Sequence, residues 1–151
     1  MSDDWLRPMS RLGAAALVGA LVGGERQLRG SPAGLRTHML VSLGAAIVIA
    51  LCDGGSPDAT SHVIQGVATG IGFLCAGEIL HRVREGQEAV RGLTSAASLW
   101  VTAALGMSAA LGRWALVVVG GVATLVTLSL VQGLERVFPA ARAPRGGGPS
   151  A

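Results

Sequence analysis

The stretches HVIQGVATGIGFLCAGEIL (residues 62–80) and LTSAASLWVTAALGMSAALG (93–112) decide which kind of fold this chain can adopt. Each is close to the ~20 residues that an α-helix needs to cross the ~30 Å hydrocarbon layer of a bilayer. A hydrophilic, arginine-bearing segment, HRVREGQEAVRG (81–92), joins them. Both stretches are rich in Gly and Ala, and helices in lipid associate through small residues that let their backbones approach closely. This region therefore predicts a compact membrane bundle rather than a single anchor.

Three glycines in the first stretch predict where its helix packs. Gly66, Gly70 and Gly77 fall at positions i, i+4 and i+11, so they share one face of a helix. We expect this face to contact another helix of the same bundle.

The composition places the whole chain in the membrane class. Its 151 residues are 50% hydrophobic and 14% charged, with a mean hydropathy of +0.55, whereas a soluble domain carries about 25% charged residues. The net charge is +3, but the arginines are spread over separate loops without a basic-aromatic motif, which disfavours nucleic acid as a partner. The spacing of Cys52 and Cys75 matches neither a zinc site nor a disulfide framework.

The hydropathy pattern predicts an all-α, polytopic transmembrane bundle of about five spans. We expect one membrane domain over residues 1–138, followed by a disordered cytoplasmic tail at 139–151 that is rich in Pro and Gly. The first apolar segment is short for a span and reaches ~20 residues only if its helix begins near Trp5. A signal peptide is the rival interpretation of this segment, although no A-x-A-like cleavage site follows it. The five apolar segments are 12–24, 38–52, 62–80, 93–112 and 114–134.

The arginines predict the orientation of the bundle. With the N-terminus outside, nine of the twelve arginines lie in inner loops or the tail, and only Arg7, Arg11 and Arg113 lie outside. The positive-inside rule then favours an outer N-terminus and a cytoplasmic C-terminus. Trp5 and Trp114 both fall at the outer interface, where indole rings prefer to lie.

Few ionisable residues lie within the predicted spans, and such residues are functional candidates because burying them in lipid is costly. Glu25 and Glu78 are each followed four residues later by an arginine, Arg29 and Arg82. One interpretation is a pair of interfacial ion pairs in the favourable helical order. The other is a shared inner cavity in which the two carboxylates bind a cation or a partner.

Uncharged polar residues form a stripe in the fourth segment. Ser95, Ser98 and Thr102 fall at i, i+3 and i+7, on one helical face. Such stripes most often make interhelical hydrogen bonds, and a polar conduit is the alternative. His38, His62 and His81 each lie at the end of a predicted span, without metal-ligand spacing. Because no catalytic constellation converges in the sequence, we expect neither an enzyme nor a bound cofactor.

Four blocks of the chain lie at residues 11–26, 33–46, 65–77 and 90–106. Together they resemble the bacterial MgtC/SapB family of membrane proteins. They lie in the order and at the spacing of that family and cover about residues 11–112. Cys75 and Glu78 depart from the commoner residues of the third block, and GGER replaces the more usual GLER of the first. The blocks are RLGAAALVGALVGGER (11–26), AGLRTHMLVSLGAA (33–46), QGVATGIGFLCAG (65–77) and VRGLTSAASLWVTAALG (90–106).

The resemblance implies a multi-pass protein of the bacterial inner membrane. Members of the family support growth at low magnesium and survival inside phagocytes, through regulatory effects on membrane energetics and the F-type ATP synthase rather than through plain magnesium transport. Virulence-type members carry a further soluble domain, so the shorter SapB-like form fits this chain better. The implied partners are the lipid bilayer, a membrane protein resembling the ATP synthase, and a second copy of the chain. A small ion channel or transporter subunit is the alternative function, and a purely structural partner-binding bundle is a third.

Matching the family's polar positions to this chain gives a set of candidate functional residues, with Glu25 and Arg36 first. We expect these two to form a contact between helix ends at the inner face, which would present a fixed polar surface to a partner. With Glu78 added from its place in a span, the set is Glu25, Arg26, Arg36, Thr37, His38, Gln65, Glu78, Arg91 and Thr94.

Overall fold

The computed structural model describes residues 3–52, 55–83 and 92–137, and this part of the chain is entirely helical. Five helices follow one another, and each contains most or all of one predicted apolar segment, which confirms the all-α expectation. Residues 139–151, the predicted tail, lie outside the described part. The helices are α1 (Asp3–Leu28), α2 (Leu35–Ala50), α3 (Pro57–Val83), α4 (Leu93–Ala110) and α5 (Trp114–Val137).

The lengths of the helices suit a bilayer to different degrees. The short first segment is part of a helix of 26 residues, which at about 1.5 Å per residue is roughly 39 Å long. In α3 and α4, Pro57–Ile79 and Leu93–Ala110 are long and apolar enough to cross a membrane. Apolar stretches of α2 and α5, Leu35–Ala50 and Trp114–Leu130, are shorter. The sequence stretches 62–80 and 93–112 therefore correspond to the two helices whose length and hydropathy best suit a membrane span.

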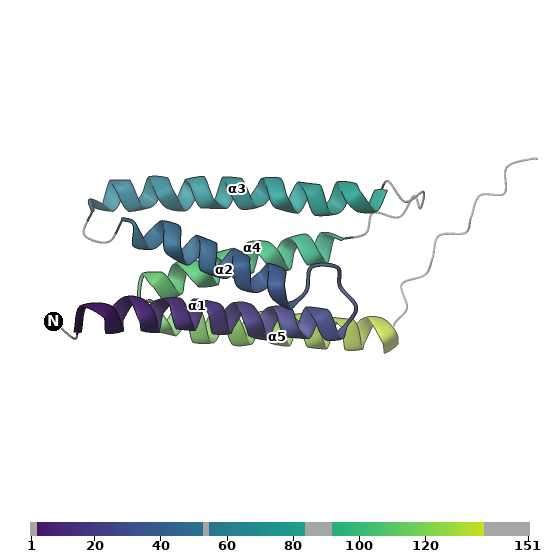
Figure 1. Cartoon of the computed structure of the whole chain (residues 1–151). Helices are drawn as coiled ribbons and strands as arrows, with labels where there is room; N and C mark the ends of the chain where they lie inside the picture. The colour runs from purple at the N-terminus through teal and green to yellow at the C-terminus, as the bar shows by residue number, and fades with distance from the viewer. Residues whose placement is uncertain (1–2, 53–54, 84–91, 138–151) are drawn as a thin grey trace, which may run out of the picture.

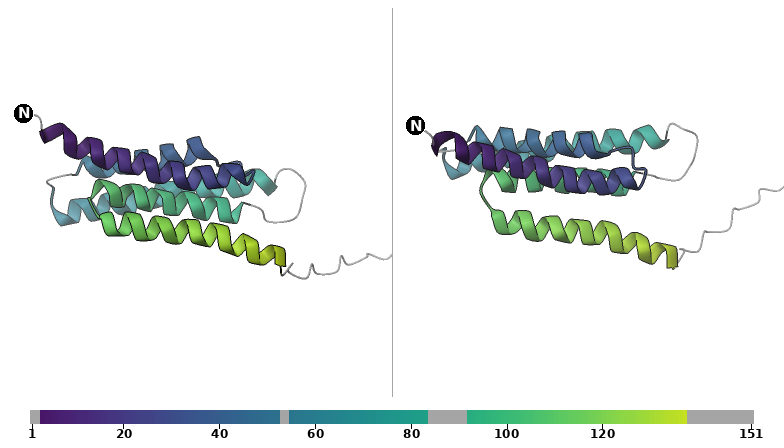
Figure 2. Two further views of the ribbon diagram at one scale, coloured as in Figure 1. Left: turned by 90° about the horizontal axis from the view of Figure 1, so that it is seen from below. Right: turned by 60° about the horizontal axis from the view of Figure 1, so that its bottom comes forward.

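The helices lie side by side along a common axis, with α4 at the centre (Figure 1). Among the described residues, α4 packs against all four other helices, whereas α3 contacts α4 and α2, and α5 contacts α4 and α1. Accordingly, α5 lies along one side of the bundle (Figure 2). Of the apolar window in α4, 61% is buried, compared with 6% of the window in α3. α4 is the core of the bundle, and α3 lies at its periphery.

Glycine residues determine how closely α2 approaches α1 and α4. A Cβ atom at Gly106 of α4 would collide with the backbone oxygen of Ser42 in α2. On α1, a Cβ at Gly19 would lie 2.8 Å from the carbonyl oxygen of His38, and one at Gly23 would lie 2.8 Å from the Cα of Leu35. Because a side chain at any of these positions would separate the backbones, the contacts of α2 with α1 and α4 depend on glycine.

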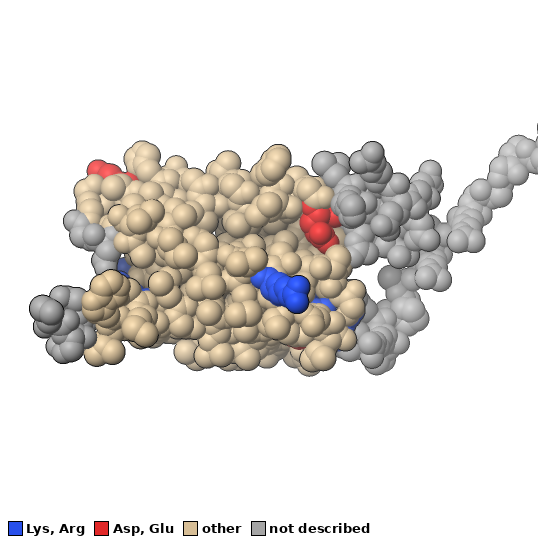
Figure 3. Space-filling model, in the orientation of Figure 1, with Lys and Arg blue, Asp and Glu red and all other residues tan. Residues whose placement is uncertain are grey.

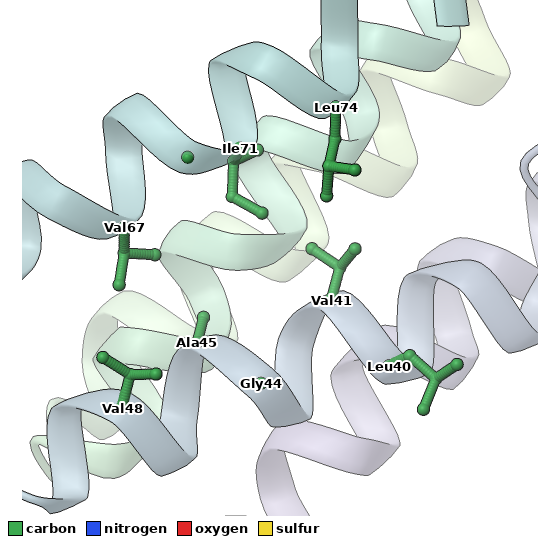
Figure 4. A pocket seen from close by; sticks show the side chains of 9 residues that line it. Leu40, Val41, Gly44, Ala45, Val48, Val67, Ile71 and Leu74 are labelled. Carbon is green, nitrogen blue, oxygen red and sulfur yellow. The ribbon is translucent and has the colours of Figure 1, made fainter. Parts of the chain in front are cut away.

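The predicted packing face of α3 is wrong. A Cβ at Gly66, Gly70 or Gly77 would meet no atom within 4 Å, and all three glycines are exposed. The packed face is the neighbouring one, because its larger side chains reach the bundle: Val67, Ile71 and Leu74 point toward α2 across an apolar groove of about 400 Å³, with Gly70 at the edge of this face (Figure 4). Helical spacing defined the glycine face correctly, but it could not say which face turns inward.

Candidate functional site

Buried polar side chains gather in the half of the bundle where α1 ends and where α2 and α4 begin. Elsewhere the described core is apolar, with Ile49, Ile71 and Met107 among alanines. On the face drawn in Figure 3, charged side chains of the described residues lie toward the ends and the middle carries none. The buried polar residues are Arg26, His38, Ser42, Ser95, Ser98 and Thr102.

Arg26 links three parts of the chain. It lies in the last turn of α1 and is only 6% exposed. Its Nη2 donates to the hydroxyls of Ser31, in the loop before α2, and Ser95, in the first turn of α4, each at 3.1 Å. The two serine oxygens lie 3.0 Å apart. Its Nε is buried and has no hydrogen-bond partner among the described residues. A buried cation whose hydrogen bonds, among the described residues, all go to neutral hydroxyls is an unusual arrangement.

His38 continues the network toward the middle of the bundle. It is completely buried, with Nδ1 at 3.0 Å from the carbonyl oxygen of Gly34 and Nε2 at 3.1 Å from the hydroxyl of Ser98. Because a carbonyl oxygen can only accept, Nδ1 carries the proton and the Ser98 hydroxyl donates to Nε2 when the histidine is neutral. The same hydroxyl lies 2.8 Å from the carbonyl oxygen of Ser95, and its single proton serves one acceptor at a time.

The polar stripe of α4 faces the interior, and two of its three members bond to other helices. Ser95 accepts from Arg26 of α1, and Ser98 bonds to His38 of α2, so the interhelical interpretation is confirmed for both. Thr102 instead donates to the carbonyl oxygen of Ser98 in its own helix at 2.8 Å. We call Arg26, Ser31, His38, Ser95 and Ser98 the Arg26 network.

The expected contact between Glu25 and Arg36 is wrong. The partner of Glu25 is Arg29, one turn later, which confirms the interfacial ion pair for this glutamate. Arg36 is exposed on the first turn of α2, and no ion pair joins it to Glu25 in the described structure. The Glu25 side chain is 13% exposed, and its Oε1 contacts Nε of Arg29. Arg26, the next residue, is the one that enters the bundle.

The second glutamate, Glu78, is half-buried near the C-terminal end of α3. Its Oε1 is buried and has no hydrogen-bond partner within the described ranges. The side chain of Arg82, its expected partner, is not among those described, so this pair stays a prediction. Over the described residues, no group of three or more His, Cys, Asp or Glu side chains could hold a metal ion. A cavity in which Glu25 and Glu78 bind a cation therefore gains no support.

The family model that matches the chain is that of the MgtC family, over residues 12–137. The chain belongs to the MgtC family. That match covers four of the five helices completely and most of α1. Proteins of this family are membrane proteins, and α3 and α4 of this MgtC-family chain are long and apolar enough to cross a membrane.

Curated relatives agree with the family model. Protein SrpB of Synechococcus elongatus is 45% identical over 145 residues, which cover 89% of this chain and 80% of the relative. The putative magnesium transporter YhiD of Escherichia coli is 40% identical over 129 residues, or 80% of this chain and 58% of YhiD. Protein MgtC of Salmonella typhimurium is 48% identical over 101 residues, or 67% of this chain and 42% of MgtC. No solved structure matches the chain.

The candidate polar residues of this MgtC-family chain occupy different environments. Arg26 and His38 are buried in the Arg26 network, while Thr37, Gln65 and Thr94 are exposed, as is Arg36. Arg91 lies outside the described residues. From its spacing alone His38 was expected at the end of a span, and only the family resemblance made it a candidate; Ser31 and Ser42 were expected to have no role. His38 and Ser42 could have been identified from the sequence. Together with Ala45 and Ile49 they follow one another at helical spacing, which is the pattern that identified the stripe of α4.

Proposed function

We propose that this protein is a regulatory component of magnesium or ion homeostasis in a bacterial inner membrane, and that it is neither an enzyme nor a conduit for ions. The observation that carries this proposal is the distribution of polar groups in the interior. The Arg26 network occupies one half of the bundle, and beyond Thr102 the buried side chains of the described core are apolar, chiefly alanine with Ile49, Leu105 and Met107. A permeation path needs polar groups that line a continuous route from both sides.

The proposed mode of action is contact with another membrane protein. Family resemblance suggests a partner of the ATP synthase kind. The Arg26 network supports this mode because it fixes the end of α1, the loop before α2 and the start of α4 relative to one another. A partner that binds this end of the bundle would meet a surface whose shape the network determines.

The alternative function is a small ion channel or transporter subunit, which the name of the relative YhiD, putative magnesium transporter, favours. Reconstituting the purified full chain in liposomes that contain a magnesium-sensitive dye separates the two functions. We expect an external magnesium pulse to produce no more influx than in protein-free liposomes, because the apolar half of the core offers a hydrated cation no ligands. Influx that rises with the amount of protein would establish the transporter instead.

The proposed topology is five spans with the N-terminus outside and the C-terminus in the cytoplasm. Its support is the split of nine inner to three outer arginines. A reporter that fluoresces only in the cytoplasm, fused after Ser150, should be bright, whereas a periplasm-dependent phosphatase fused at the same position should be inactive. The opposite pair of results would contradict the orientation.

A further inference from the structure

The outward face of α3, at the edge of the bundle (Figure 1), carries an amide side chain at a position that suits lipid contact. Gln65 is exposed, and its side-chain amide makes no hydrogen bond to a described residue. It lies within Pro57–Ile79, the part of α3 that is long and apolar enough to cross a membrane. At about 1.5 Å per residue, Gln65 is roughly 12 Å from the beginning of this stretch, inside the hydrocarbon layer of a bilayer that α3 crosses.

An amide at this depth needs a hydrogen-bonding partner, because the hydrocarbon contains no water that could take that role. A glutamine side chain is too short to reach the interface from there, as the longer side chains of lysine and arginine do. The nearby hydroxyl of Thr69 already donates to the backbone carbonyl oxygen of Gln65 at 2.9 Å, so its proton is not available to the side-chain oxygen. These observations point to a partner on another molecule.

The residues in line with Gln65 form a surface on which another helix can pack. Gln65, Thr69, Gly72 and Ala76 follow one another at intervals of four, three and four residues, and all four are exposed. This heptad spacing is typical of helices that cross at about 20°, as most helices in membrane bundles do. A Cβ at Gly72 would meet no atom within 4 Å, so the described bundle leaves this surface open. We call these four residues the α3 seam.

The chemistry of the α3 seam is complementary to itself. A primary amide has both N–H donors and an oxygen acceptor, so two Gln65 side chains related by a twofold axis can each donate to the other. Copies inserted in the same orientation bring these amides to the same depth, and the seam contains no charge that would require a different partner. We propose that two copies of this chain associate through the α3 seam, with their Gln65 amides hydrogen-bonded to one another. One polar residue in a seam of this kind fixes the register of the pair.

The test measures association of the full chain in phosphatidylcholine liposomes. Copies that carry a donor or an acceptor fluorophore after Ser150 are mixed, and energy transfer between them is followed as the protein is diluted with lipid. We expect transfer to persist at dilutions where unassociated proteins no longer meet by chance, and single complexes with one label per chain to bleach in two steps. Transfer no greater than chance proximity produces, or bleaching in one step or in more than two, would overturn the proposal.

Substitutions at Gln65 test the hydrogen bonds. Gln65→Leu should raise the protein-to-lipid ratio needed for half-maximal transfer about tenfold, because it removes two hydrogen bonds between helices from each dimer. Gln65→Asn retains the amide and should recover part of this loss. Association of Gln65→Leu that equals that of the wild type would show that the amide is not at the contact.

A matched pair of glycine variants tests the surface. Gly72→Val should weaken association, because its side chain keeps the two backbones apart. Gly70→Val adds the same side chain beside the apolar groove, outside the α3 seam, and should associate as the wild type does. A Cβ at either glycine has open space, so both variants should keep the bundle folded. Equal association of the Gly72 and Gly70 variants would contradict the assignment of this surface.

Discussion

Gly106→Val is expected to prevent the bundle from assembling. The new Cβ would collide with the backbone oxygen of Ser42 and lie 2.8 Å from its hydroxyl oxygen, so α4 and α2 would have to separate. Overpacking a closely packed site costs about 1–3 kcal/mol even where the neighbours are side chains that can move. Here the neighbour is backbone, and α4 contacts every other helix. We expect the variant to lose most of its yield and to aggregate on mild heating in detergent.

Gly70→Val is the matched control. It adds the same side chain to a glycine of α3 that has open space around it. This variant should retain the yield and melting temperature of the wild type. If instead Gly70→Val unfolded the protein and Gly106→Val did not, then the glycine face of α3 would be the packed one and the central position of α4 would be wrong.

This pair of glycines shows what the sequence could predict about the fold. Hydropathy located all five helices, because an apolar stretch of span length leaves a signal that requires no knowledge of its neighbours. It could not identify α4 as the centre, since the apolar segments 62–80 and 93–112 are alike in composition and length. The two differ in how they pack: Gly106 meets a specific carbonyl of α2, whereas Gly70 meets nothing. Such pairing depends on contacts between distant segments, which a local pattern does not contain.

Only part of the candidate site could be predicted from the sequence, because the rest of it also depends on contacts between distant segments. The stripe at Ser95 and Ser98 was visible because three hydroxyl residues at helical spacing are unusual in an apolar segment. Its partners were harder to predict, because Arg26 and His38 stand at the ends of spans, where charged and polar side chains normally face water. Only the close approach of α1 and α2 to α4 turns them inward. The contact expected between Glu25 and Arg36 was wrong at this step, and Arg26 enters the bundle instead, since neighbouring residues point to different sides of a helix.

Arg26→Met should abolish the regulatory activity while leaving the bundle folded. Two effects on the free energy of unfolding oppose each other. Losing the bonds to Ser31 and Ser95 costs about 0.6 kcal/mol each in a membrane protein. Removing a buried arginine relieves a penalty of roughly 2.5–3.5 kcal/mol at mid-bilayer, and less near the interface. Methionine retains much of the volume of the arginine stem, so we expect little change in abundance or melting temperature.

Arg36→Met provides the comparison, because Arg36 lies at the same end of the bundle, occupies another candidate position and is exposed. Loss of its charge leaves the Arg26 network intact. The variant should therefore behave like the wild type, even though the change in net charge is identical.

The most direct test of the account is growth at low magnesium of a bacterium whose own MgtC-family protein has been deleted, with membrane levels of each variant measured by immunoblot. The account predicts that wild type and Arg36→Met restore growth, and that Arg26→Met is present at a similar level but does not. Full restoration of growth by Arg26→Met would contradict the central claim that the buried Arg26 network is the functional site of this protein.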